Sequence, residues 1–193
     1  MPKVSEEHLA RRRRQILDAA LDCFAGQGFH VTSMQDIFRA SGLSAGAVYR
    51  YFPTKTSLIR EIAADTLTDA ASLLDNVGTS AGVPSVPDVV TSIVRKLGTG
   101  RPSRVPIIVQ IWAEAMRDGE LAELARSLLG HLLDRLRHLL DLHVKAGRLP
   151  PDADTAALAH LVLATIQGYI IQLGIFGEVP EDQVEAAVRA VFG

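Results

Sequence analysis

The 193-residue sequence is poor in the residues that carry redox and metal chemistry. Its single cysteine, Cys23, excludes an intrachain disulfide and a zinc site built from several cysteines. Only 5% of the residues are aromatic, with one tryptophan, so a cage of rings around a cationic ligand is poorly supported. Residues 3–14 are mostly polar and basic, where a signal peptide would be apolar. We therefore expect a cytoplasmic protein.

The sequence also lacks several short motifs of common enzymes, namely the P-loop, GxGxxG and HExxH. One group of potential metal ligands lies between residues 131 and 143: His131, Asp134, His138, Asp141 and His143. Arginines interrupt this group, which is typical of a solvated helix face. We expect a protein that is not an enzyme and that holds no cofactor or metal.

The net charge of −2 conceals an uneven distribution. Residues 1–60 hold nine basic and five acidic residues, a charge of +4, whereas residues 61–193 hold eleven basic and seventeen acidic ones, a charge of −6. A small basic part next to a larger acidic part suggests one module for a polyanion and another for a different partner. A solvated arginine run on a surface helix would explain the same charges.

Apolar residues recur at three- and four-residue intervals almost throughout, and alternating strand patterns are scarce. The pattern predicts an all-α fold of about nine helices. Thr32 with Gln35 fits a capping box, and Thr54 fits the cap of a long helix. The expected helices span residues 9–25, 33–40, 45–52, 55–76, 89–97, 106–118, 120–146, 155–176 and 181–192.

The helices expected at 33–40 and 45–52 are joined by a tight turn at Gly42, and the second is basic and aromatic. This arrangement is typical of a helix-turn-helix, which places its second helix in the major groove of DNA. The apolar residues of the pair can form a small core with the first helix; they are Met34, Ile37, Phe38, Leu43 and Val48 against Ile16, Ala20 and Phe24.

An aromatic run followed by lysine and leucine, VYRYFPTKTSL, occupies residues 48–58. It follows a set of spaced residues: Ile16, Ala19, Ala20, Phe24, Gly28, Thr32, Ile37, Ala40, Gly42 and Leu43. With these features, residues 12–58 resemble the DNA-binding domain of the TetR (tetracycline repressor) family. Cys23 departs from the family pattern, in which a larger aliphatic residue is usual.

The resemblance implies a DNA-contacting surface around the 45–52 helix. Small residues would face the bases and allow close approach, while Arg50 would contact guanine or a phosphate. Arg11 to Arg14 would lie near the DNA backbone or act as a minor-groove arm. The implied DNA-contacting residues are Thr32, Ser33, Gln35, Ser44, Ala45, Gly46, Ala47, Tyr49, Arg50, Tyr51 and Lys55.

Residues 155–177 contain no charged side chain, so a membrane span must be weighed. His160, Gln167 and Gln172 inside the run and its acidic flanks favour a buried helix, and we expect no membrane association. By resemblance, this helix and the last one would pair with their two-fold mates in a homodimer. The expected interface residues are Ala157, Ala164, Gly168, Ile171, Ile175, Val184, Val188 and Val191.

The resemblance also implies a small-molecule effector inside the larger domain. The expected ligand-binding residues are Gln110, Trp112, Met116, Leu139, His143, Tyr169 and Gln172, each of which would otherwise be ordinary core. We therefore expect residues 1–54 to bind double-stranded operator DNA and residues 55–193 to bind the effector and dimerise. The function so implied is that of a repressor released from a palindromic operator by a mostly apolar effector. The alternative is a helical small-molecule-binding protein without sequence-specific DNA binding.

Overall fold

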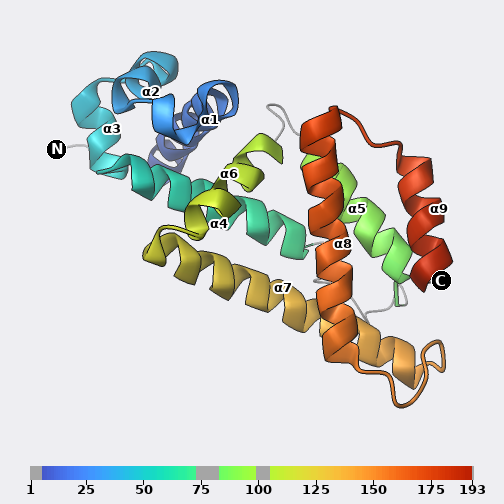
Figure 1. Ribbon diagram of the computed structural model, residues 1–193. Helices are drawn as coiled ribbons and strands as arrows, with labels where there is room; N and C mark the ends of the chain where they lie inside the picture. The colour runs from blue at the N-terminus through green and yellow to red at the C-terminus, as the bar shows by residue number, and fades with distance from the viewer. Residues whose placement is uncertain (1–5, 73–82, 99–104, 193) are drawn as a thin grey trace.

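The computed structural model describes residues 6–72, 83–98 and 105–192, and within these ranges every regular element is an α-helix. The all-α prediction is confirmed, with nine helices in the described ranges (Figure 1). They are α1 (Glu6–Val31), α2 (Met34–Ser41), α3 (Ala45–Tyr51), α4 (Lys55–Ser72), α5 (Val86–Gly98), α6 (Val105–Ala115), α7 (Gly119–Lys145), α8 (Thr155–Phe176) and α9 (Glu181–Phe192).

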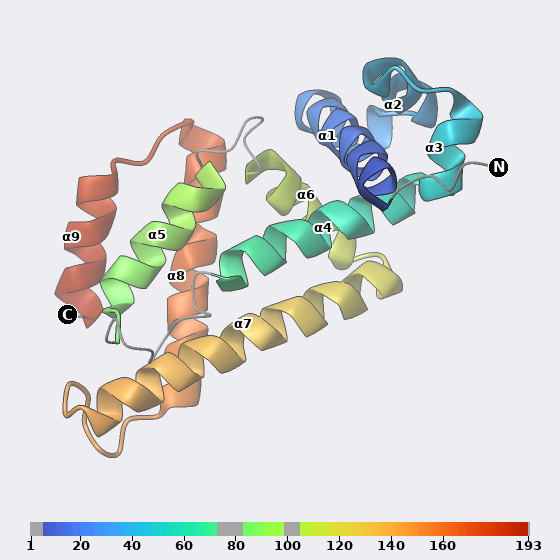
Figure 2. The ribbon, with the colours of Figure 1, turned by 180° about the vertical axis from the view of Figure 1, so that it is seen from behind.

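Two clusters of buried apolar side chains hold the helices together. The first cluster joins α1, α2 and α3 to the start of α4, and it also takes in Ile107 and Ile111 of α6 and Leu121 of α7. The second is built from α5, α6, α7, α8 and α9. Helix α4 runs from the three N-terminal helices to the C-terminal layer, beside α7 (Figures 1 and 2). The first cluster thus extends across the boundary expected at residue 54, and that boundary stays a prediction.

Helix α1 is longer than expected and contains a kink rather than an end at Gly26. Gly28 has φ 81° and ψ 165°, a backbone conformation that favours glycine. The helix that follows begins one residue later than the Thr32–Gln35 pattern suggested, because Ser33 is the N-cap of α2 and Asp36 completes its capping box. The prediction of Thr32 as the cap is therefore wrong.

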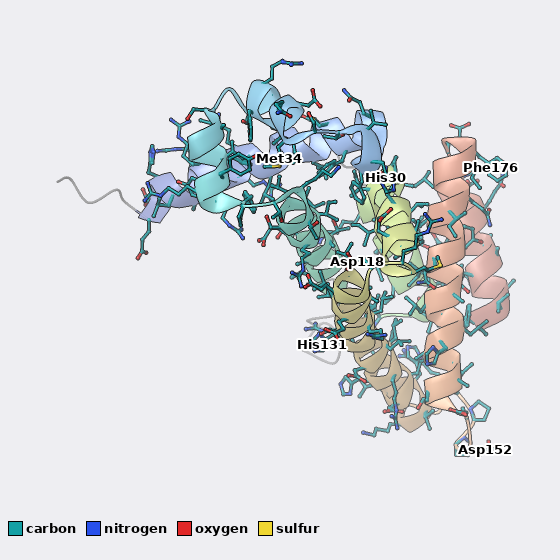
Figure 3. All side chains as sticks on the ribbon, turned by 60° about the vertical axis from the view of Figure 1, so that its left-hand side comes forward. His30, Met34, Asp118, His131, Asp152 and Phe176 are labelled. Atoms are coloured by element: carbon teal, nitrogen blue, oxygen red, sulfur yellow. The ribbon has the colours of Figure 1, made fainter. Side chains whose placement is uncertain are left out.

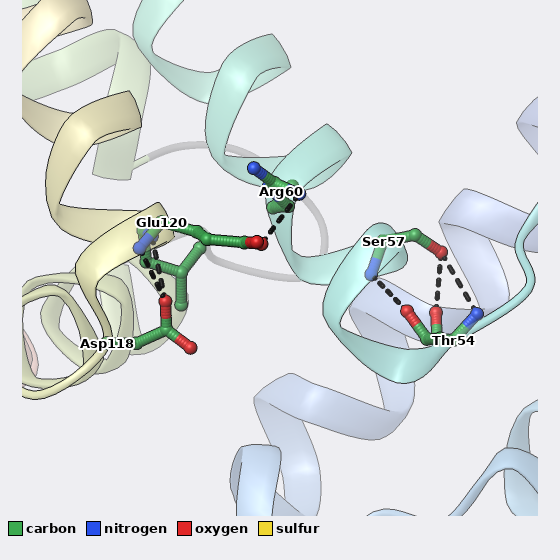
Figure 4. Close-up of polar contacts among 6 residues, drawn as sticks. Thr54, Ser57, Arg60, Asp118 and Glu120 are labelled. Atoms are coloured by element: carbon green, nitrogen blue, oxygen red, sulfur yellow. Dashed lines mark hydrogen bonds and ion pairs between the residues drawn. The ribbon is translucent and has the colours of Figure 1, made fainter.

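Side chains cap three other helices, and one of them, Thr54, occupies the position that the sequence indicated. Thr54 and Ser57 exchange backbone-to-hydroxyl hydrogen bonds at the start of α4, at 3.0 and 3.3 Å (Figure 4). Asp118 accepts the N–H groups of Glu120 and Leu121 at the start of α7. Asp154 does the same for α8. Helix α4 is described as far as Ser72, and the expected extension to residue 76 lies outside the described residues.

Helix α8 is, among the described helices, the one long and apolar enough to span a membrane by length and composition. One of its sides packs on α5, α6 and α7 in the second cluster. Its opposite side carries exposed apolar residues, including Leu161, Ile171 and Ile175. This is the arrangement of a core helix with one face left for a partner.

Candidate functional site

Helix α3 is held at the surface by the burial of its inner side against α1 and α2 in the first cluster. Val48 of α3 and Ile37 of α2 are fully buried, and the rings of Phe38 and Tyr49 meet edge to face with centroids 5.2 Å apart. Gly42 makes the turn between α2 and α3 at φ 66°. The amide of Gln15 on α1 donates to the Ser41 carbonyl at 2.7 Å, which fixes the end of α2. The orientation of α3 is therefore set by packing on both neighbours.

The outer side of α3 combines small residues with one long cation. Ala45 and Gly46 are exposed and Ala47 is half-buried, so this helix turn offers little steric bulk. Arg50 is exposed and forms no ion pair within the described part of the chain. Tyr49 is 47% exposed although its ring packs on Phe38. Tyr51 is half-buried, and Ser44 caps the helix through the Ala47 N–H at 3.3 Å.

The start of α2 presents fewer groups to DNA than expected. Thr32 is only 1% exposed, and its hydroxyl donates to the Gly28 carbonyl at 2.8 Å, so the predicted contact between the Thr32 side chain and DNA is wrong. The Ser33 hydroxyl and the Ser33 N–H donate to the Asp36 carboxylate at 2.6 and 2.9 Å. These two bonds lower the pKa of Asp36 below its ordinary value. Gln35 is exposed.

Lys55 links the first turn of α4 to the end of α1. Its ammonium donates to the Phe29 carbonyl at 2.6 Å and to the Thr32 carbonyl at 3.1 Å. An ammonium has three N–H donors, so one remains for a phosphate. Sequence reasoning missed this role of Lys55.

The arginine run lies within α1 and does not form a separate arm. Arg13 pairs with Glu61 at 2.6 Å, and its guanidinium lies 5.4 Å from the centre of the Phe52 ring. Arg14 pairs with Asp18 at 2.9 Å and approaches Asp65 at 3.6 Å. Arg13 and Arg14 thus join α1 to α4, and the expectation that the whole run serves DNA is corrected.

A groove of about 560 Å³ lies between α6, α7 and α8. Of the residues expected to bind ligand, Trp112 and Met116 line it. Its remaining lining residues were missed, because no sequence pattern shows which sides of three separate helices meet. They are Ala115, Ala122, Ala125, Arg126, Leu129, Gly130, Leu133, His160, Leu163 and Gln167.

The groove adjoins a small apolar cavity of about 20 Å³ in the second cluster. Trp112 and Gln167 line both spaces and therefore stand between the surface and the interior. The inner space is lined in addition by residues of α4 and α5, including Thr66 and Ile93. A ligand entering from the groove would meet almost entirely apolar surface.

Two family models match this chain, one in its N-terminal part and one in its C-terminal part. Residues 16–62 match the model described as bacterial regulatory proteins, tetR family. Residues 88–192 match the one described as BetI-type transcriptional repressor, C-terminal.

The full-length relatives agree with these matches. The chain is 32% identical to the HTH-type transcriptional repressor Rv1474c of Mycobacterium tuberculosis, over 98% of this chain and 99% of that protein. It is 27% identical to the HTH-type transcriptional regulator UidR of Escherichia coli, over 94% and 91% of the two chains. Among solved structures, Salmonella enterica GusR superposes with a TM-score of 0.78 at 25% identity, covering 99% of each chain.

The chain belongs to the TetR family. It is a DNA-binding regulator of transcription. The proteins it resembles are regulators, and the expectation that it is not an enzyme is confirmed.

Five residues expected at the effector site of this TetR-family protein lie elsewhere. Gln110 faces α1, and Leu139 is 1% exposed in the core. Tyr169 packs against the second cluster and Gln172 is exposed. His143 lines a different cavity, between α5, α7, α8 and α9. The expected set therefore does not form one site.

The residues expected at the dimer surface are mostly exposed on α8 and mostly buried on α9. Ala157, Ala164, Ile171 and Ile175 are exposed and Gly168 is half-buried. In contrast, Val184 and Val188 are each 2% exposed because that stripe of α9 packs against its own chain, where α9 contacts α5. Val191 is 71% exposed.

A polar joint connects α6 to the kinked end of α1. The Gln110 side-chain oxygen accepts the Phe29 N–H at 2.7 Å. One turn further along α6, Glu114 meets the ring Nε2 of His30 at 2.7 Å (Figure 3 shows His30 where α1 meets α6). Closer to α3, Arg60 of α4 pairs with Glu120 of α7 at 3.0 Å (Figure 4). The DNA-binding helices are thus attached to the C-terminal helices through both α4 and α6.

Proposed function

We propose that this TetR-family regulator is a cytoplasmic repressor that binds a palindromic operator as a homodimer and is released by a small, mostly apolar effector. The observation that carries the DNA-binding part is the exposed outer side of α3, with Arg50 unpaired among the described side chains and small residues beside it. The alternative of a ligand-binding protein without sequence-specific DNA contacts would leave that surface without a role.

Arg50 and the small residues supply the base contacts in this proposal. An arginine can donate two hydrogen bonds to guanine, while Ala45 and Ala47 can contact thymine methyl groups. Gly46 lets the helix backbone approach closely. Positioning on the phosphates would come from Gln35, Ser33, Ser44, Tyr49, Tyr51 and the remaining donor of Lys55.

The exposed side of α8 supports the dimer. Its small and aliphatic residues, from Ala157 to Ile175, would allow close helix packing across a two-fold axis. On α9 the exposed side chains next to the buried valines, Gln183, Ala187 and Val191 at four-residue intervals, would add to this surface. A two-fold pair would place two copies of α3 about 34 to 36 Å apart, in successive major grooves.

The groove at Trp112 is the proposed effector site. Its volume of about 560 Å³ lies within the usual range for small-molecule sites, and its lining is mostly apolar. Polar contacts would come from Gln167, His160 and Arg126.

Helix α6 offers the route from the effector to DNA. Trp112 lies in the groove, while Gln110 and Glu114 on the same helix hold Phe29 and His30 in the segment 28–32 at the end of α1. Lys55 of α4 holds the carbonyls of Phe29 and Thr32 in that same segment, and Ser33, the cap of α2, follows directly. A ligand that binds unequally to two positions of α6 would therefore shift α2 and α3.

The experiment is a mobility-shift titration with DNA from upstream of the protein's own gene, repeated across a salt series. A sequence-specific regulator loses affinity steeply with salt but keeps its preference over scrambled DNA. Equal affinity for operator and scrambled fragments at every salt concentration would favour the alternative. Screening small molecules for release of the bound fragment then tests the effector.

A further inference from the structure

A second cavity of about 470 Å³ lies at the end of the molecule away from α3, and we call it the distal cavity. It is lined by residues from the start of α5, the ends of α7 and α9, the start of α8 and the turn between α7 and α8. These helix ends lie near one another in the ribbon (Figures 1 and 2). It shares no lining residue with the groove at Trp112. Its lining residues are Ser85, Val86, Leu140, His143, Arg148, Leu149, Leu158, Arg189, Val191 and Phe192.

The wall of the distal cavity is mostly apolar, and hydrogen bonds hold two of its polar side chains in place. Six of its ten lining residues are aliphatic or aromatic. His143 is 7% exposed, and its ring Nε2 lies 2.9 Å from the Pro84 carbonyl, which can only accept, so Nε2 carries the proton. Ser85 donates to the Asp88 carboxylate at 2.6 Å. These contacts hold Ser85 and His143 in position without a ligand.

The two arginines of the distal cavity differ in their charge environment. Arg189 pairs with Glu185 at 2.8 Å and approaches Asp88 at 3.8 Å, so its charge is compensated. Arg148 donates to the Val83 carbonyl at 3.3 Å and, among the described residues, has no carboxylate within ion-pair distance. The cavity therefore combines a mostly hydrocarbon wall with the exposed guanidinium of Arg148, which pairs with no carboxylate among the described residues.

We propose that the distal cavity binds a small organic carboxylate with an apolar body, independently of the effector groove. Arg148 has four N–H donors beyond the one given to Val83, and a guanidinium matches a carboxylate in geometry and charge. The hydrocarbon part would lie against Leu140, Leu149, Leu158 and Phe192, displacing water from apolar surface. A cationic ligand would meet the like charge of Arg148, and a neutral one would leave that charge unpaired.

The test uses the full chain and decanoate as the probe, with decanol as the uncharged counterpart, and measures binding by titration calorimetry below micelle-forming concentrations. Decanoate is expected to bind, and Arg148→Met is expected to weaken it at least tenfold while leaving decanol unchanged. Arg148→Lys, which keeps the charge but loses the geometric match, should weaken decanoate less than Arg148→Met does. Leu149→Trp should fill the cavity and weaken both probes.

The matched control is Arg117→Met, which removes an exposed guanidinium that lines neither the distal cavity nor the groove at Trp112. This variant should bind decanoate as the parent chain does. The proposal is overturned if decanoate does not bind, if Arg148→Met binds it normally, or if Arg117→Met weakens it as much as Arg148→Met does. Operator affinity of Arg148→Met, measured separately, should equal that of the parent chain, so failure here leaves the DNA-binding proposal intact.

Discussion

The side-chain oxygen of Gln110 on α6 accepts the backbone N–H of Phe29 on α1 at 2.7 Å, next to the kink at Gly28. A Cβ at Gly28 would stand 3.3 Å from the same oxygen, so the glycine permits both the kink and the close approach. This contact joins residues 81 positions apart in the chain. It fixes the DNA-binding helices to the helix that lines the proposed effector groove.

Gln110→Ala should weaken the link between effector and DNA. The variant leaves the partly buried Phe29 N–H without its acceptor, a loss of about 1 to 3 kcal/mol in the free energy of unfolding. Operator affinity without effector should change little, whereas effector-induced release should need more ligand. The comparison is a mobility-shift titration with and without effector, with Gln27→Ala on the exposed side of α1 as control. Unaltered release in Gln110→Ala would remove α6 from the proposed route.

Arg50→Ala should relax base preference at one position of each half-site. The expected cost is about 1 to 3 kcal/mol on the preferred sequence, with a smaller cost on the sequence substituted at that position. Binding to a library of single-base operator variants measures this difference. A uniform loss across the library would assign Arg50 to a phosphate instead of a base.

Lys55→Ala should weaken binding to all DNA sequences alike and also lower the stability of the protein. The lysine has one donor left for a phosphate, and it serves the carbonyls of Phe29 and Thr32. We expect a smaller salt dependence of DNA binding and a lower midpoint of denaturant unfolding. Lys145→Ala, which removes an exposed cation from the far end of α7, is the control. A change in base preference alone would contradict this assignment.

Asp36→Asn should destabilise α2 at neutral pH. The Ser33 hydrogen bonds lower the pKa of the Asp36 carboxyl in the folded chain, so ionisation of Asp36 favours folding. This contribution is full above the ordinary aspartate value of 3.8 and disappears as pH falls through the lower folded pKa. Unfolding of the parent and the variant should therefore differ at pH 7 and converge in acid. A difference that grows as pH falls would contradict this account.

Ile171→Asp should separate the proposed dimer into single chains. Ile171 is 42% exposed in the single chain and lies on the side of α8 assigned to the two-fold contact. A buried, unpaired carboxylate there would oppose association. Analytical ultracentrifugation should show the parent as a dimer and the variant as a monomer with much weaker operator binding, while Ser127→Asp on α7 stays dimeric. A monomeric parent chain would refute the proposed dimer itself.

The sequence predicted the helices well because each carries its own apolar periodicity and cap. Thr54 lies at the start of α4, as its position indicated. The cap of α2 was misassigned because Thr32 with Gln35 and Ser33 with Asp36 both fit the pattern. The cap is Ser33, because the Thr32 hydroxyl donates to the carbonyl of Gly28 at the kink of α1.

The surfaces between helices were predicted less well. The valines of α9 form an apolar stripe, but the pattern does not tell whether that stripe meets its own chain or a second copy. The effector groove draws on one side each of α6, α7 and α8, so no local pattern reveals it. Likewise, the charge of Arg13 and Arg14 suggested DNA, whereas Glu61 and Asp18, with Asp65 farther off, engage them.

The most direct test of the central claim is hydroxyl-radical footprinting of the protein on the DNA upstream of its own gene. Two copies of α3 related by a two-fold axis predict two protected half-sites with centres about 34 to 36 Å apart, related by a palindrome. A chain carrying both Arg50→Ala and Tyr49→Ala should lose this protection. No protection at low salt by the parent chain, or protection unchanged in the double variant, would contradict the claim that α3 reads the operator.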